Sequence, residues 1–90
     1  MFEVLVYKKF EKDIKNFHPN VKNRIKELIL DLSQNPVPRG KFDIAKIEGT
    51  DSYYRCRITY SRTVYEVLWE QKIVKILKVE RRDEHTYKKL

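Results

Sequence analysis

The sequence predicts an α+β fold in which two N-terminal helices pack on one face of a small, mainly antiparallel sheet. Three observations lead to it: an alternating segment at the N-terminus, a helical period over residues 8–32, and a period of two from residue 43 onward. Two amphipathic helices and a half-apolar sheet bury their apolar faces against each other. Since 90 residues support one core, we expect a single domain over residues 1–90.

The N-terminal third is predicted to hold a strand and two helices. Residues 2–7 alternate between two faces, as a strand does, and residues 8–17 carry apolar side chains at helical spacing. A second helix begins near Pro19, which suits a first helical turn, and ends before Pro36. The apolar positions of the two helices are Phe10, Ile14 and Phe17, then Val21, Ile25, Leu28, Ile29 and Leu32.

From residue 43 the apolar pattern has the period of strands. Residues 43–48 are predicted as a short strand, and three longer alternating segments follow, with tight connections at residues 60–61 and 70–71. Residues 83–90 are predicted as a short C-terminal helix, since acidic residues stand near its start. The side chains expected to face the helices are Tyr54, Cys56, Ile58, Thr63, Tyr65, Val67, Trp69, Ile73, Leu77 and Val79.

Composition limits the classes of protein that fit. The formal net charge is +7, which favours a polyanionic or acidic partner, although any single lysine is more simply a solvated surface residue. Cys56 has no second cysteine with which to form a disulfide or a zinc site. No apolar run approaches the roughly 20 residues of a membrane span, and the N-terminus lacks signal-peptide features. We therefore expect a cytoplasmic protein with no membrane association, cofactor or metal.

Side-chain alternation gathers arginines on the sheet face opposite the helices. Arg55 and Arg57 lie there if Cys56 faces the core, and Arg62 joins them from the next strand. Arg82 falls on the same side if the last strand stays extended that far. Like charges opposite one another destabilise a sheet, so the cluster favours an anionic ligand. The alternative is that the strands splay or that nearby carboxylates pair with the arginines.

Four runs of sequence resemble a known family. KIEG at 46–49, YRCRI at 54–58 and RTVYEV at 62–67 resemble the central signature of RelE-type toxins, a branch of the RelE/ParE toxin superfamily. VERRDEHTY at 79–87 is similar to their C-terminal motif, a basic residue followed by a tyrosine. The match covers nearly the whole chain. It implies a microbial RNase-type fold and the toxin of a type II toxin–antitoxin system, which cleaves messenger RNA on the ribosome and binds a RelB-like antitoxin.

The resemblance also implies residue roles. It assigns Arg62 and Arg82 to the family's two catalytic arginines and Tyr87 to its catalytic tyrosine. Arg55 and Arg57 stand where the best-known members have two lysines. Because arginine does not give up its proton, these two residues are expected to bind phosphate rather than to act as bases. Tyr87 is then the expected general base.

Three further residues complete the predicted site. Lys46 and Arg81 are expected to bind substrate, and Arg81 is a substitute for Arg82, because the spacing to the tyrosine is one residue shorter than in some members. His85 is the alternative acid or base. RNA supplies its own nucleophile, the 2′-hydroxyl, so the chemistry requires neither a metal-bound water nor a cofactor.

Two other functions fit the same fold. One is a ParE-like toxin that binds DNA gyrase and lacks RNase activity, and the other is a nucleic-acid-binding module without catalysis. The combination of Arg62, Arg82 and Tyr87 favours the nuclease, because a gyrase binder has no chemical need for those three side chains.

Overall fold

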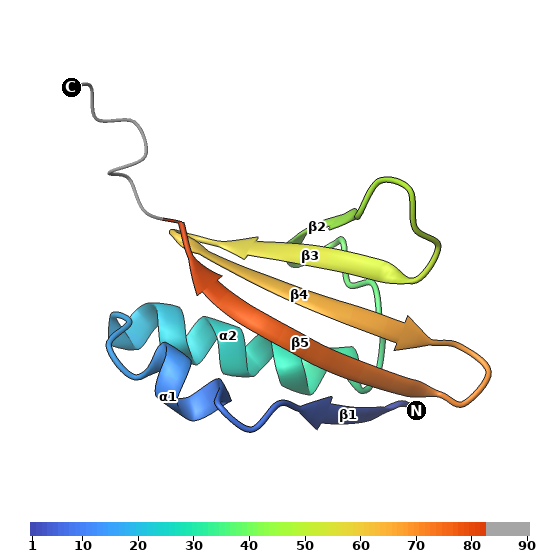
Figure 1. Ribbon diagram of the computed structural model, residues 1–90, viewed down its shortest axis with the longest axis horizontal. Coiled ribbons are helices and arrows are strands. Elements are labelled where there is room, and N and C mark those ends of the chain that lie inside the picture. The colour runs from blue at the N-terminus through green and yellow to red at the C-terminus, as the bar shows by residue number, and fades with distance from the viewer. Residues whose placement is uncertain (83–90) are drawn as a thin grey trace.

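The computed structural model describes residues 1–82, and within them five strands form one mixed sheet in the order β1-β5-β4-β3-β2 (Figure 1). Strand β1 (Glu3–Val6) runs parallel to β5 (Ile73–Arg81), and the other neighbouring strands are antiparallel. The remaining elements are α1 (Phe10–Ile14), α2 (Pro19–Leu32), β2 (Asp43–Lys46), β3 (Tyr53–Ile58) and β4 (Ser61–Leu68). The predicted α+β class and mainly antiparallel sheet are confirmed, whereas the helix predicted at residues 83–90 lies outside the described residues.

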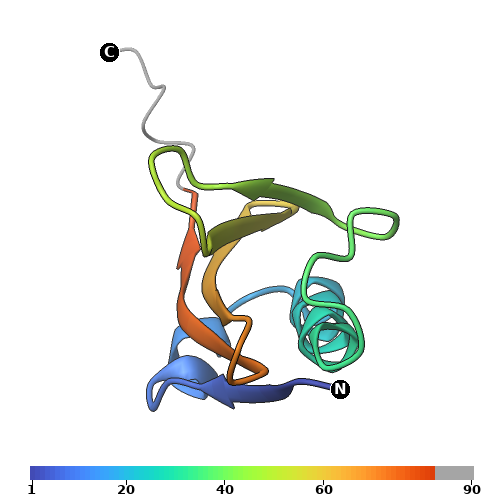
Figure 2. The same cartoon turned by 90° about the vertical axis from the view of Figure 1, so that its right-hand side faces the viewer.

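Helix α2 lies in the hollow of the strongly twisted sheet (Figure 2). Its N-cap is His18, whose Nδ1 accepts a hydrogen bond from the N–H of Asn20 at 3.0 Å, and Pro19 occupies the first turn as predicted. The helix buries the predicted stripe except Ile29, which is only partly buried, and the stripe joins the inner face of the sheet in one core. Neither described helix has the length and apolar character needed to cross a membrane. The buried residues of α2 are Val21, Ile25, Leu28 and Leu32.

Helix α1 lies beside the second half of β5, where β1 has ended (Figure 1). The pairing of β1 with β5 stops at Val6 and Ile76. Farther along β5, the N–H of Val79 donates to the hydroxyl of Tyr7 at 3.0 Å, and this hydroxyl donates to Asp13 of α1 at 2.7 Å. Burial and the bond to Asp13 raise the pKa of Tyr7 to about 12. A side chain therefore satisfies a backbone donor that an open strand edge would expose.

Strand β5 departs from the predicted alternation. The sequence placed Ile73 and Leu77 toward the helices, but the structure buries Val74 and Ile76 instead. The ladder between β4 and β5 shifts by one residue midway, and Leu77 is left without a cross-strand partner. After this bulge Val79 is buried again, as predicted. The prediction for Ile73 and Leu77 was wrong because a period of two cannot show where an extra residue enters a strand.

The prediction that Trp69 faces the core was also wrong. Strand β4 ends at Leu68, and Trp69 begins the turn to β5, where it is 48% exposed and meets the ring of Phe2 edge-on. Lys72 in this turn has φ 60°, and Thr59 in the β3–β4 turn has φ 55°. Left-handed backbone is uncommon for residues with a side chain, so both hairpins close without the glycine that usually marks them.

Candidate nucleic-acid interface

Three arginines share the sheet face opposite α2. Arg57 of β3 lies directly opposite Arg62 of β4, and Arg55 lies opposite Val64 in the adjacent row. Directly opposed residues of an antiparallel pair project from the same face, with Cβ atoms about 4.5–5.5 Å apart. The backbone register therefore brings two cationic side chains together, and we call this surface the arginine face.

The middle of the arginine face has an apolar floor. Val64 is only 6% exposed although it points away from the core that α2 covers. Its neighbours on this face are Arg55 across β3, Lys78 across β5 and Arg62 along β4. Long cationic side chains commonly cover an apolar neighbour with their aliphatic stems. Guanidinium groups that stand over an apolar floor bind an anion more strongly than they do in bulk water.

Carboxylates neutralise part of the arginine face. Glu80 Oε2 lies 3.8 Å from Arg62 Nε, and Asp43 Oδ1 lies 3.4 Å from Arg55 Nη1. The first distance is too long for a hydrogen bond, and the buried Arg62 Nε has no hydrogen-bond partner in residues 1–82. Arg57 is exposed and forms no ion pair within the same described range. Carboxylates therefore neutralise part of the charge of Arg55 and Arg62, whereas the guanidinium of Arg57 is available to bind an anion.

The end of β5 contacts Tyr60, in the turn between β3 and β4, through a hydrogen bond and a cation–π contact. The N–H of Arg82 donates to the carbonyl oxygen of Tyr60 at 2.6 Å, and the guanidinium of Arg81 lies 4.4 Å from the centroid of its ring. The ring also meets Phe17 edge-on, and its hydroxyl accepts a hydrogen bond from the N–H of His18 at 2.7 Å. Tyr60 thus joins the start of α2 to the end of β5, a role that sequence reasoning missed because an aromatic residue in a turn gives no distinctive signal.

The structure separates residues that the prediction grouped together. Arg81 pairs with the buried Ser61, on the side of the sheet that faces α2. Arg82 follows Arg81, so alternation places its exposed side chain on the arginine face. Lys46 pairs with the core residue Tyr54, and β2 therefore directs it away from that face. Arg82 is accordingly better placed than Arg81 or Lys46 to act with the arginines of β3 and β4.

The predicted acid–base residues are not in the described part of the chain. Tyr87 and His85 both lie beyond residue 82, so their roles remain predictions. Burial raises the pKa of Tyr65 far above its usual range and that of Cys56 to about 12. Both side chains point into the core, and neither serves the arginine face.

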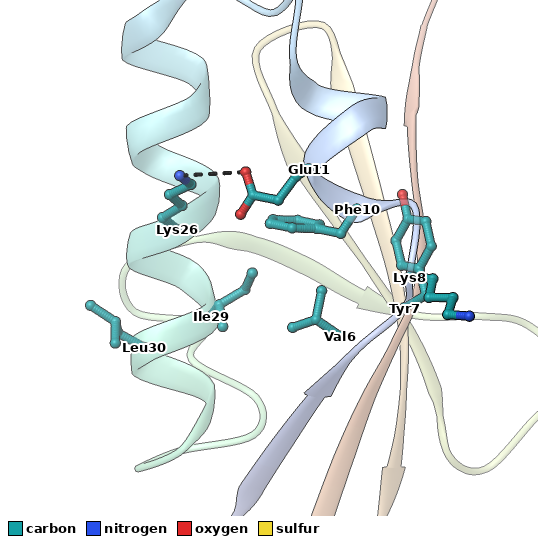
Figure 3. A pocket seen from close by; sticks show the side chains of 8 residues that line it. All are labelled: Val6, Tyr7, Lys8, Phe10, Glu11, Lys26, Ile29 and Leu30. Atoms are coloured by element: carbon teal, nitrogen blue, oxygen red, sulfur yellow. Dashed lines mark ion pairs between the residues drawn. The ribbon is translucent and has the colours of Figure 1, made fainter.

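A separate apolar pocket of about 510 Å³ lies between α1, α2 and the end of β1 (Figure 3). Phe10 and Ile29 line it, and Leu30 at its side is 72% exposed. An ion pair of 3.8 Å between Lys26 and Glu11 spans the two helices at its rim. This pocket belongs to the helical layer and lies away from the arginine face.

Comparison with known proteins identifies the class to which this fold and its arginine face belong, a family of small toxins. The family model described as "ParE toxin of type II toxin-antitoxin system, parDE" matches residues 4–86. The chain belongs to this RelE/ParE family and is the toxin of a type II toxin–antitoxin system.

Three of the similar proteins come from archaea. The putative toxin RelE1 of Methanocaldococcus jannaschii is 44% identical over 82 residues, which are 91% of each chain. The structure of the archaeal RelE–RelB complex from Pyrococcus horikoshii OT3 contains a chain 35% identical to this one, with a TM-score of 0.80 over 92% of this chain and 97% of that one. A chain of the RelB–RelE complex from Methanococcus jannaschii is 30% identical, with a TM-score of 0.73 over 92% and 94%.

Proposed function

We propose that this toxin is an endoribonuclease that cuts messenger RNA on the ribosome without a metal ion. The observation that carries the proposal is the direct opposition of Arg57 and Arg62 on neighbouring strands. Like charges in that position destabilise a sheet, and an anion bound between them relieves the repulsion. The resemblance to RelE-type toxins favours the RNA backbone as this anion.

The reaction needs a base, a nucleophile and stabilisation of negative charge. Tyr87 takes the proton of the RNA 2′-hydroxyl, whose oxygen then attacks the neighbouring phosphorus. The bond from phosphorus to the 5′-oxygen breaks, the leaving oxygen takes a proton from water, and the products are a 2′,3′-cyclic phosphate and a 5′-hydroxyl. Arg62 stabilises the charge on the phosphate oxygens, and Arg82 stabilises the leaving oxygen. Each contact of this kind is worth about 2–4 kcal/mol in other enzymes.

Arg55 and Arg57 act on the substrate before the chemical step. Both stand next to Arg62 on the arginine face, and a guanidinium binds two phosphate oxygens at once. Neither can serve as a base, because arginine stays protonated in proteins. Their role in the proposal is to hold the RNA backbone, while the ribosome aligns the 2′-hydroxyl for attack, a contribution that is often large.

The proposal includes a RelB-like antitoxin. Two similar solved structures, from Pyrococcus horikoshii and Methanococcus jannaschii, are complexes of RelE with RelB. The apolar pocket of Figure 3 and the exposed Leu30 offer a docking surface for the apolar face of such a partner. A net charge of +7 steers an acidic protein toward the toxin. Binding and action on the ribosome place the toxin in the cytoplasm.

A ParE-like toxin that binds DNA gyrase is the second candidate, because the matching family model bears the ParE description. The experiment that separates the two uses the purified toxin with translating ribosomes and, in parallel, with gyrase. The nuclease predicts new RNA ends that appear in the presence of a chelator and disappear in Arg62→Ala. Inhibition of supercoiling without new RNA ends would establish the gyrase function instead. Cleavage of naked RNA that a chelator abolishes would contradict the metal-independent mechanism.

A further inference from the structure

A polar pocket of about 390 Å³ opens beside Arg57, where β2 begins. Strand β2 starts at Asp43, opposite Arg57, whereas β3 continues through Ile58 into the turn at Thr59. The residues that line the pocket come from α2, from the start of β2 and the chain just before it, and from the end of β3. Its walls include Asn20, Arg24, Lys41, Phe42, Arg57 and Thr59.

Arg24 is held in one orientation at this pocket. Its guanidinium carbon lies 4.0 Å from the centroid of the buried Phe42 ring. Its Nη1 donates to Glu27 at 3.0 Å, and its Nη2 donates to the carbonyl oxygen of Lys41. One flat side of the guanidinium therefore rests on an aromatic ring, and two of its nitrogens are engaged at the edges. The side chain is still 37% exposed and lines the pocket, and a guanidinium can stack on a planar ligand.

Cations stand beside this platform. Arg57 lines the pocket and also faces Arg62 across the sheet. The Nζ of Lys41, which Asp31 holds at 2.9 Å, lies at the rim and is largely exposed. Asp43 is the one carboxylate among the residues that line the described pocket, and Arg55 draws its Oδ1 to 3.4 Å. A flat cationic platform with a phosphate-binding arginine beside it has the chemistry to bind a nucleotide.

We propose that this pocket binds the RNA nucleotide next to the scissile phosphate. Its base stacks on the guanidinium of Arg24, and Arg57 and Lys41 bind its phosphate. Unpaired bases of single-stranded RNA stack on arginine planes and on aromatic rings in other proteins. Because Arg57 belongs both to the pocket and to the arginine face, the RNA backbone passes from one to the other without a gap. The inference rests on the proposed function, since it takes single-stranded RNA as the ligand.

The test measures binding separately from cutting. The probe is a short single-stranded oligonucleotide with 2′-deoxyribose at every position, which cannot be cleaved because it lacks the 2′-hydroxyl. In a series of such probes, a single abasic site is moved from one position to the next. Fluorescence anisotropy gives Kd at low salt for the wild type and for Arg24→Lys, which keeps the charge and loses the plane. One abasic position should weaken wild-type binding on the order of ten-fold, as expected for a lost stack. The same abasic site should leave binding by Arg24→Lys unchanged.

A pair of exposed lysines provides a second measurement. Unlike Arg24, neither lysine stacks on Phe42, so the result does not depend on how that ring repacks. Lys41→Gln removes a cation at the pocket, and Lys26→Gln removes one of similar exposure at the rim of the apolar pocket in Figure 3. Lys41→Gln should weaken binding. It should also make the negative slope of log association constant against log salt concentration shallower by about 0.7. Lys26→Gln should leave both unchanged.

Three outcomes overturn the inference: no binding by the wild type, equal sensitivity of wild type and Arg24→Lys to every abasic site, or equal losses in the two lysine variants. The nuclease is judged by a different readout, the RNA ends formed on ribosomes. If binding behaves as expected and no RNA ends form, the nucleotide site stands and the proposed nuclease falls. If RNA ends form and the abasic series is flat, the nuclease stands and this site falls.

Discussion

The backbone N–H of Arg82 donates to the carbonyl oxygen of Tyr60 at 2.6 Å, so the hydrogen-bonded ladder continues one residue beyond the end of β5. Tyr60 is two residues before Arg62, in the turn that leads into β4. The two arginines that the family resemblance marks as catalytic therefore share one rigid backbone frame at the same end of the sheet (Figure 1). A site that stabilises a transition state requires such fixed donors.

Substitution of the arginines should separate the cutting step from binding. Arg62→Ala and Arg82→Ala should each slow single-turnover cleavage at saturating ribosomes by about 10²–10³-fold, the usual cost of one charge-stabilising donor. Arg57→Ala should mainly raise Kd and reduce its salt dependence. Rates and Kd values measured on the same programmed ribosomes check this. Equal losses of affinity alone at all three positions would remove the case for distinct roles.

Tyr87→Phe should lower the cleavage rate by about 10²–10⁴-fold, the contribution of a general base, and leave ribosome binding intact. The argument is that Arg55 and Arg57 cannot accept a proton. The wild-type rate should rise with pH in the alkaline range, and this rise should flatten in the variant. His85→Ala is the control: if it abolishes cutting while Tyr87→Phe cuts like the wild type, the base is the histidine.

Tyr60→Phe should reduce the free energy of unfolding by about 1 kcal/mol, because the N–H of His18 loses its acceptor. Cleavage should change little, since the backbone carbonyl that holds Arg82 and the ring against Arg81 both remain. Tyr60→Leu also loses the aromatic contacts and should be less stable than Tyr60→Phe. Urea denaturation of the three proteins measures the series, and equal stability of all three would show that Tyr60 does not join α2 to β5.

Tyr7→Phe should reduce the free energy of unfolding by about 1–3 kcal/mol, because it leaves the partly buried N–H of Val79 without an acceptor. Hydrogen exchange at the Val79 amide should accelerate correspondingly. Tyr53→Phe is a matched control, since the Tyr53 hydroxyl forms no hydrogen bond within residues 1–82. If both variants match the wild type, the edge of β5 does not depend on the Tyr7 hydroxyl.

Stability should fall in alkali, in part because of Cys56. Burial raises the pKa of this thiol from 9.0 to about 12, so the unfolded chain loses the proton first as pH rises. The folded state therefore loses stability above pH 9, by at most about 1.4 kcal/mol per pH unit for this group. Tyr7 adds a loss of the same sign above pH 10, since its pKa is raised to about 12. Denaturation at pH 8 and about pH 10 should show a smaller decline in Cys56→Ala than in the wild type; an equal decline would contradict the assignment.

The sequence was most informative where one period runs through an element. The stripe of α2 and the alternation of β3 both gave the correct buried faces, because each side chain faces the core once per period. The shared face of Arg57 and Arg62 followed from this alternation, whereas their direct opposition appears only in the register of β3 and β4. The face of Arg82 could also be inferred, since counting back from it to Val79 does not cross the bulge.

The features that the sequence did not predict depend on contacts between distant segments of the chain. The bulge at Leu77 reflects the fit of β5 against β4, which no local pattern encodes. The parallel pairing of β1 and the bond from Tyr7 to Val79 join residues about 70 positions apart in the chain. The platform of Arg24 on Phe42 likewise joins a helix to the segment before β2. Such features arise from packing and therefore appear only in the structure.

The opposed arginines also link the stability of the toxin to its surroundings. The carboxylates opposite Arg57 and Arg62, Asp43 and Glu80, offset part of the repulsion between the two arginines, and a polyanion that binds between them relieves the rest. A ligand that binds only the folded state raises the free energy of unfolding in proportion to the logarithm of its concentration over Kd. We therefore expect the free toxin to unfold and to be degraded more readily than the toxin bound to RNA or to an acidic protein. In the proposed mechanism, the charges that bind RNA also limit how long the toxin survives alone.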